Sequence, residues 1–167
     1  MLRTKRWRGL AATVASSLLA LTAVATFVGT ASAGDTTITV FDVEGPYTKS
    51  VDAGTPGFGP GDLVLEIQPL INPMDQSSVG KVYTRIQVMK LLKGGDFVFF
   101  LDCQVDLAGG NILFSGSAKF SDFSTGATFP VTGGTGSYAL ARGSVSGVFG
   151  KVGGKDGATL TFDLTTT

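Results

Sequence analysis

Asp42 is the first residue whose type and position could do chemistry. It follows Ile38 and Val40 at every second position, so on a strand its carboxyl group shares a face with apolar side chains. Glu44 comes two residues later, before a Gly-Pro step that ends the strand. A carboxylate held in apolar surroundings can stabilise positive charge that develops on a bound molecule. The alternative is that both carboxylates face solvent, where charged residues on strands usually lie.

Arg142 is the second candidate, because residues 138–142 read Tyr-Ala-Leu-Ala-Arg. The alternation predicts a strand on which Tyr138, Leu140 and Arg142 share one face. An arginine on an enclosed apolar face is costly unless an acid or a ligand pairs with it, and Asp42 is the candidate acid. We therefore predict Arg142 and Asp42 as a catalytic pair, with Tyr138, Leu140 and Glu44 binding the substrate. If Arg142 faces solvent instead, this site is wrong.

The remaining polar residues on strand-like segments give weaker signals. Arg85 shares its face with other polar side chains, which predicts an outer, solvent-facing position. Glu66 and Gln68 alternate with apolar residues on their own face, so their orientation stays open. Asp62 follows a glycine at a strand start, where an aspartate commonly makes local backbone hydrogen bonds.

Two kinds of catalytic centre are excluded by composition. The chain has no histidine and one cysteine, Cys103, which rules out histidine-dependent triads and His- or Cys-rich zinc sites. Cys103 alternates with phenylalanine and leucine, so we interpret it as a small buried side chain. A reactive thiol is the alternative, but no base or cation pattern surrounds this cysteine. No metal site and no cofactor are expected.

Short alternating segments separated by glycine, proline and serine follow one another along the chain. This spacing predicts an all-β barrel or sandwich, because no segment after the leader has a useful helical period. Eight strands can close around an interior that is filled by side chains or holds one small ligand. The eight predicted strands are residues 36–43, 62–71, 79–91, 96–107, 110–120, 127–132, 137–149 and 158–164.

The glycines at 133, 134 and 136 predict a tight turn between two strands. A reversal within so few residues requires at least one of them to adopt a positive φ. A phosphate-binding loop would need a lysine after the last glycine and then a helix, whereas Ser137 and a strand pattern follow here.

Residues 1–33 have the order of a secretory signal peptide. Four basic residues precede an apolar run from Leu10 to Val28, and Ala31-Ser32-Ala33 is a cleavage motif. The alternative is an uncleaved membrane anchor, although alanine, threonine and serine dilute the apolar run. We expect cleavage before Gly34, export by the general secretory route, and a single mature domain over residues 34–167.

Cleavage changes the charge balance. The chain has 13 basic and 13 acidic residues, and the leader removes four basic ones, which leaves 9 against 13 and a net charge of −4. No basic run survives, so nucleic acid is excluded as a partner. After cleavage no membrane association is expected.

The run Gly-Gly-Thr-Gly-x-Tyr-x-x-Ala-Arg-Gly at 133–143 resembles a motif of plant dirigent proteins, and a close variant occurs in allene oxide cyclases. Gly61-Asp62-Leu63-Val64, Val79-Gly80 and the segment from Gly110 to Gly116 follow the same order as in those families. The resemblance implies an eight-stranded antiparallel closed β-barrel and homotrimers. It also implies an acidic pocket residue at Asp42 and a pocket arginine at Arg142.

Other parts of the family pattern are absent. The pocket cysteine of the cyclases falls near Ile86, their pocket tyrosine falls near Ala118, and residues 116–119 lack the dirigent aspartate. The sequence therefore predicts an exported barrel that binds an apolar small molecule in its lumen. Such a barrel could steer a cofactor-free cyclisation, isomerisation or stereoselective coupling. A non-catalytic carrier and a purely structural barrel are the alternatives.

Overall fold

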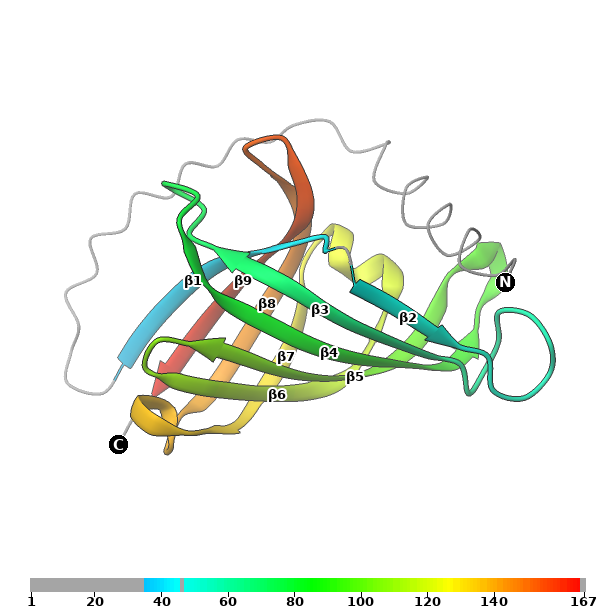
Figure 1. Cartoon of the computed structure of the whole chain (residues 1–167). Coiled ribbons are helices and arrows are strands. Elements are labelled where there is room, and N and C mark those ends of the chain that lie inside the picture. The colour runs from blue at the N-terminus through cyan, green and yellow to red at the C-terminus, as the bar shows by residue number, and fades with distance from the viewer. Residues whose placement is uncertain (1–34, 46, 166–167) are drawn as a thin grey trace.

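The computed structural model describes residues 35–45 and 47–165, which form nine strands and three short 3₁₀ helices (Figure 1). The predicted leader and its cleavage site lie outside the described residues. Within them, no helix is long and apolar enough to cross a membrane. The strands are β1 (Asp35–Val43), β2 (Tyr47–Val51), β3 (Leu63–Ile71), β4 (Ser78–Leu91), β5 (Phe97–Leu107), β6 (Gly110–Lys119), β7 (Ala127–Gly134), β8 (Arg142–Val152) and β9 (Lys155–Thr165).

The strands form an antiparallel barrel of eight strands with one extra strand, which confirms the predicted fold class. Going round the sheet, the order is β1, β9, β8, β7, β6, β5, β4, β3, and β1 then pairs with β3. Only two residue pairs make that closing contact, Phe41 with Ile71 and Asp42 with Leu70. The seam between β1 and β3 is therefore the narrowest pairing in the barrel.

The extra strand β2 continues along β3 where β1 ends. Its five residues pair with Leu63 to Ile67, whereas β1 pairs with the last two residues of the same strand, Leu70 and Ile71. Between β1 and β2 the backbone passes close to β3 at Gly45, where a Cβ would meet the Ile67 carbonyl oxygen at 2.9 Å. β2 was not predicted, because its five residues show no apolar alternation.

Period-two alternation sorts the side chains into a lumen and an outer face, as expected for a barrel. On β5, Phe99, Leu101, Cys103 and Val105 are buried, while their neighbours are partly exposed. Three rings fill the middle of the lumen: Phe114 lies 6.0 Å from Phe129 and 5.8 Å from Phe162. Hydrophobic burial of these inner faces is the main stabilising term of the barrel.

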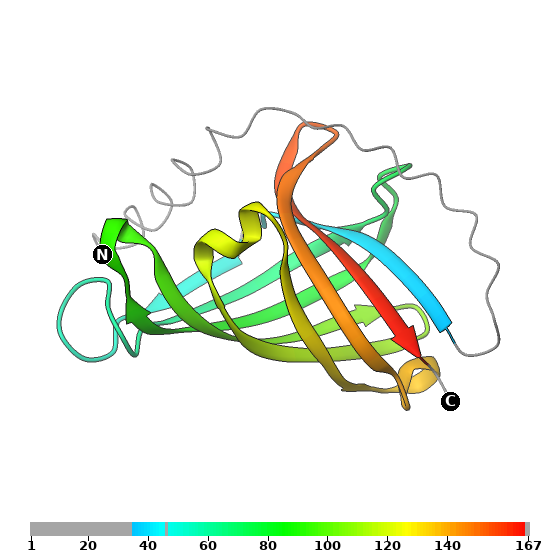
Figure 2. The same ribbon diagram turned by 180° about the vertical axis from the view of Figure 1, so that it is seen from behind.

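The 3₁₀ helix η2 (Phe120–Ser124) covers one end of the lumen (Figure 2, yellow). Its Phe123 packs on the lumen rings of Phe99 and Phe129, at centroid distances of 6.0 and 5.9 Å. Gly147 makes room for this ring, since a Cβ there would meet Phe123 at 2.8 Å. We call the rings at this end the aromatic cap; its members are Phe58, Phe97, Phe120, Phe123 and Phe149.

Asp62 anchors the loop that brings Phe58 to this cap. The residue is 3% exposed, and its carboxylate accepts hydrogen bonds from the backbone N–H groups of Ala53 and Gly59, at 2.9 and 3.0 Å. The prediction of a turn role for Asp62 is confirmed. Phe58 then meets Phe97 edge to face at 5.1 Å.

The glycine turn lies at the opposite end of the barrel from η2 (Figure 2). Gly136 has φ +59°, which confirms that the turn contains a glycine at positive φ. The predicted strand from residue 137 is wrong at its start, however. Residues Gly136–Tyr138 form the 3₁₀ helix η3, and β8 begins only at Arg142. A third short helix, η1 (Lys93–Gly95), joins β4 and β5.

Candidate functional site

Asp42 and Gln68 meet inside the barrel at the seam. With the Gln68 amide oriented so that its nitrogen faces Asp42, that nitrogen donates to the two carboxylate oxygens, at 2.8 and 2.9 Å. Asp42 is opposite Leu70 on β3, so its side chain enters the lumen two residues from Gln68. Gln68 is 8% exposed, and Asp42 is partly buried. The strand register therefore places the side chain of Asp42 on the predicted inner face.

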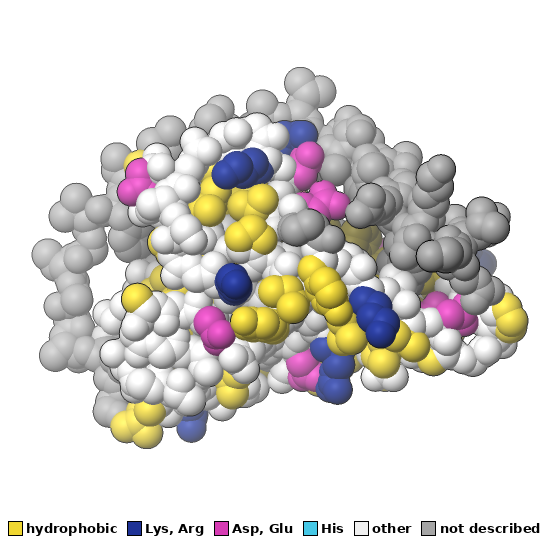
Figure 3. Space-filling view, viewed as in Figure 1, with side chains coloured by type: hydrophobic (Ala, Val, Ile, Leu, Met, Phe, Trp, Pro, Cys, Tyr) yellow, Lys and Arg dark blue, Asp and Glu magenta, His cyan; other side chains and the backbone are white. Residues whose placement is uncertain are grey.

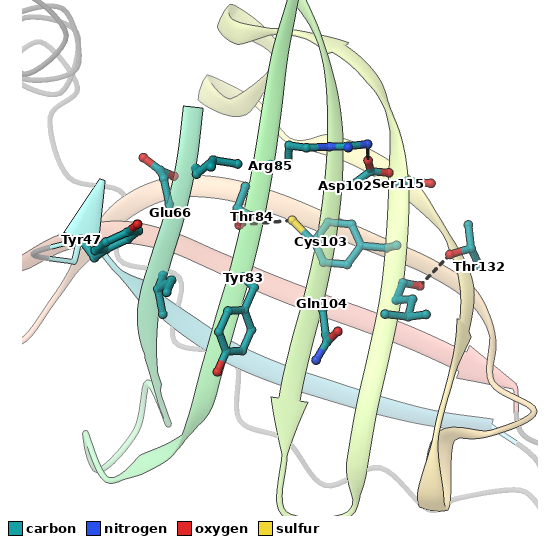
Figure 4. Close-up of a pocket in the computed structure, with 14 residues that line it drawn as sticks. Tyr47, Glu66, Tyr83, Thr84, Arg85, Asp102, Cys103, Gln104, Ser115 and Thr132 are labelled. Carbon is teal, nitrogen blue, oxygen red and sulfur yellow. Dashed lines mark hydrogen bonds and ion pairs between the residues drawn. The ribbon is translucent and has the colours of Figure 1, made fainter. Parts of the chain in front are cut away.

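Glu66 adds a second carboxyl group on the same face of β3. It is opposite Thr84 of β4, which is opposite Cys103 of β5, so the three side chains form one row across the inner face. The Thr84 hydroxyl and the Cys103 sulfur share a hydrogen bond at 3.3 Å (Figure 4). The sequence left the orientation of Glu66 and Gln68 open. The signal that resolves it is their alternation with the buried Val64 and Leu70.

Both carboxyl groups resist ionisation. Burial, and in second place the negative charge of Glu66, raise the pKa of Asp42 from 3.8 to about 8. Burial and the Glu44 carboxylate raise the pKa of Glu66 from 4.5 to about 6, against a hydrogen bond from Thr48 that lowers it. At neutral pH, Asp42 is therefore mostly protonated and Glu66 mostly ionised. One acid and one base of this kind are the two groups that proton transfer requires.

Arg142 does not join this site, and its predicted placement in the lumen is wrong. It is exposed at the start of β8, where its guanidinium donates to the Ala141 carbonyl at 2.7 Å. On β9, Arg142 is opposite Thr165 and Asp42 is opposite Ala158. Seven residues of strand separate these positions, which is about 23 Å. The predicted pair of Arg142 with Asp42 is therefore not formed.

The physical reason for the error lies in the turn that precedes β8. The 3₁₀ conformation of η3 breaks the alternation from residue 138 onward, so Ala141 is fully buried and Arg142 points outward. Leu140 is 63% exposed, and the partly buried Tyr138 packs against the hydrophobic core. Neither residue lies beside Asp42, so the structure does not bring these two predicted substrate contacts to the acid. Glu44, in contrast, is exposed directly after β1 and near Glu66.

Cys103 is buried, as we interpreted it, and burial raises the pKa of its thiol. The thiol form therefore persists at neutral pH, which argues against a nucleophilic role. Within residues 35–45 and 47–165, no three His, Cys, Asp or Glu side chains converge in a way that could hold a metal ion.

A groove of about 540 Å³ is lined by outer-face residues of β3 to β6 and also by the inner-face residues Glu66, Thr84 and Cys103 (Figure 4). Arg85 lies there in an ion pair with Asp102 of the next strand, which confirms its predicted solvent-facing position. Apolar side chains gather around the groove between basic and acidic ones (Figure 3). The most exposed of them are Tyr47, Ile67, Tyr83 and Leu113, at 37–49%.

No model of a protein family matches this chain, and no curated protein matches its sequence. Solved structures do match its fold. A pyocyanin demethylase superposes with a TM-score of 0.64 at 22% identity, over 78% of this chain and 100% of that chain. The Diels-Alderase AbmU from Streptomyces koyangensis gives 0.63 at 15% identity, over 83% and 71%. The pterocarpan synthase dirigent protein PsPTS1 gives 0.60 at 20% identity, over 78% and 92%.

The chain shares its barrel fold with these structures, a dirigent protein among them. The resemblance found at residues 133–143 is thereby confirmed for the architecture, even though the motif itself forms the η3 turn away from the acids. The similar structures are named for different activities, a demethylation, a cycloaddition and a dirigent reaction. At these identities the dirigent-like barrel is shared as a scaffold, and chemistry must be argued from the side chains of this chain.

Proposed function

We propose that the protein binds an apolar small molecule in the end of its lumen beside Asp42 and steers a cofactor-free cyclisation, isomerisation or coupling there. The observation that carries the proposal is the set Asp42, Gln68 and Glu66 on a mostly apolar inner face. Residues 1–33 are proposed to direct export, so the ligand would be met outside the cell.

The two carboxyl groups have complementary roles in this proposal. Protonated Asp42 donates a proton to one atom of the bound molecule, and ionised Glu66 accepts a proton from another or stabilises positive charge that develops there. When one proton is given and one is taken, the product is an isomer of the substrate. Apolar walls hold the molecule in one conformation and keep water away from a reactive intermediate.

Gln68 acts on Asp42 as a positioning residue. Its amide nitrogen donates to the ionised carboxylate, and after rotation its amide oxygen accepts from the protonated form. Gln68 thus holds the same carboxyl orientation before and after proton transfer. This property distinguishes the site from a carrier, which needs an apolar lumen but no buried acid.

The first test is extraction of the purified protein with organic solvent and mass spectrometry of the extract. An apolar small molecule that is present with the wild type, and displaced by 2-naphthalenemethanol, supports the lumen as a binding site. In calorimetry, the same alcohol should bind the wild type and should bind Gly147→Leu at least tenfold more weakly, because the added side chain displaces Phe123. No binding of the alcohol to the wild type would contradict the proposed function.

We propose further that copies of the chain associate through the outer groove into a homotrimer, the state that the family resemblance implies. The support is its exposed apolar side chains and its charge pattern: Lys81 and Arg85 on β4 lie beside Asp102 and Asp106 on β5. The basic side of one copy can therefore face the acidic side of the next. Light scattering should find a trimer, and Tyr83→Glu should give monomers while Met74→Glu, on the exposed turn before β4, should not. A monomeric wild type would overturn this point.

A further inference from the structure

The end of the lumen beside Asp42 has acids and aromatic rings but lacks a cation among the described residues. All nine Lys and Arg side chains of residues 35–45 and 47–165 are exposed. Arg142, the cation that would have balanced Asp42, lies at the other end of β9. Any charge compensation for an ionised Asp42 or Glu66 must therefore come from a bound molecule or from solvent.

The strand register places one ring of the aromatic cap in a row with Asp42. Phe149 on β8 is opposite Ala158 on β9, and Ala158 is opposite Asp42 on β1. All three belong to the inner face, because Phe149 alternates with the buried Val145 and Gly147. Two strand spacings of about 4.8 Å separate the backbones at Phe149 and Asp42, which is roughly 10 Å. The residue between them, Ala158, has the smallest side chain that carries a Cβ.

Phe149 is the exposed member of this cap. It is 44% exposed, yet its ring stacks on Phe123 at 4.8 Å with an interplanar angle of 21°. It also lies 5.5 Å from Phe120. An exposed ring held rigidly by two others is a stacking platform for a planar molecule. The negative face of such a ring also attracts a cation.

We propose that this site selects a planar aromatic molecule that carries a positive charge, such as a protonated amine or an N-alkylated ring nitrogen, and rejects carboxylates. The inference rests on the proposed function and names its substrate class. The ring of the ligand lies on Phe149, and its cationic group points across Ala158 to Asp42 and Glu66. An anion would enter an apolar space that already holds two carboxyl groups, where like charges repel strongly.

Three probes that share one ring and differ in charge test the inference. They are 2-naphthylmethylammonium, 2-naphthalenemethanol and 2-naphthoate, each measured by calorimetry at pH 8.5. We expect the ammonium probe to bind at least tenfold more tightly than the alcohol and at least a hundredfold more tightly than the carboxylate. The alcohol reports on the apolar lumen alone, so it separates this inference from the proposed function.

Variants assign the selectivity to named side chains. Asp42→Asn combined with Glu66→Gln should bring the ammonium and alcohol affinities within about threefold of each other. Asp163→Asn, an exposed carboxylate on β9, should keep the full preference. Phe149→Leu should weaken the ammonium and alcohol probes about tenfold. Tyr83→Leu, which changes a similarly exposed ring on the outer face, should weaken neither.

Each result separates the two claims. If the alcohol binds and the ammonium probe binds no more tightly than the carboxylate, the charge selectivity is overturned and the lumen function stands. A preference that persists in the double variant also overturns the inference, because the charge is then read elsewhere. If the alcohol does not bind but the ammonium probe does, with loss in the double variant, the cation site stands and the apolar lumen function fails.

Discussion

Gln68 donates its side-chain amide to both carboxylate oxygens of Asp42, across the only two-pair seam of the barrel. The candidate site and the closing strand pair of the barrel therefore share a residue, since Asp42 also makes one of the two backbone pairs between β1 and β3. A change at either side chain should therefore alter both the proton chemistry of the lumen and the stability of the seam.

The first prediction concerns the pH dependence of stability. Asp42 ionises near pH 8 when folded and near 3.8 when unfolded, so rising pH through this window favours the unfolded chain. The free energy of unfolding should fall by up to about 1.4 kcal/mol per pH unit and level off above pH 8. Glu66 adds to this slope only between its ordinary value of 4.5 and about pH 6. In Asp42→Asn, the slope between pH 6.5 and 8.5 should disappear in urea unfolding. A slope parallel to that of the wild type would contradict the assignment.

The second prediction isolates Gln68. In Gln68→Leu, ionised Asp42 loses its donor, and an unsatisfied buried group costs about 1–3 kcal/mol. The loss of unfolding free energy should be larger at pH 9 than at pH 6, because Asp42 is protonated at pH 6 and leaves no unpaired negative charge when the amide is removed. Gln104→Leu on the outer face should show no such pH dependence. Equal losses at both pH values would mean that Gln68 serves packing alone.

The third prediction concerns the loop that carries Phe58. Asp62→Ala removes the acceptor of two backbone N–H groups, so thermal unfolding should show a loss of about 1–3 kcal/mol. Asp62→Asn keeps one oxygen acceptor and should lose less. If the two variants melt at the same temperature, the two hydrogen bonds do not account for the effect.

The fourth prediction uses two glycines of the same turn. Gly136→Val should destabilise by about 1–3 kcal/mol, because valine at φ +59° is strained and its Cβ would approach the Gly109 carbonyl. Gly133→Val is the matched control, since a Cβ at position 133 would have no atom within 4 Å. Similar melting temperatures for both variants would show that the backbone of the turn adjusts.

The fifth prediction follows from the corrected position of Arg142. Arg142→Leu should change stability by less than about 0.5 kcal/mol and leave probe binding intact, because the side chain is exposed. If this variant no longer binds 2-naphthalenemethanol, Arg142 takes part in the binding site and its corrected position is contradicted.

Alternation allowed most of the barrel to be predicted, since successive side chains of strands such as β5 and β9 point to opposite faces. It failed at η3, where a 3₁₀ turn shifts the faces without any change in composition. Asp42 was found because regular backbone precedes it, whereas Arg142 was misplaced because a turn does. Glu66 and Gln68 stayed ambiguous because they share one face of β3 with Val64 and Leu70, while the opposite face of the strand is entirely apolar. Which face lines the lumen is decided by the pairing of β3 with β1 and β4.

The pairing of β1 with β9 has a consequence for the order of folding. Asp35 lies opposite Thr165, so the first described strand finds its partner in the last one. During synthesis β1 has no such neighbour until the final strand is available, and contacts of this sequence separation slow folding. A chain that lacks β9 would leave β1 and β8 as open edges prone to pairing with other molecules. The barrel therefore completes itself only after its last strand is made, and a truncated product is an aggregation hazard rather than a smaller barrel.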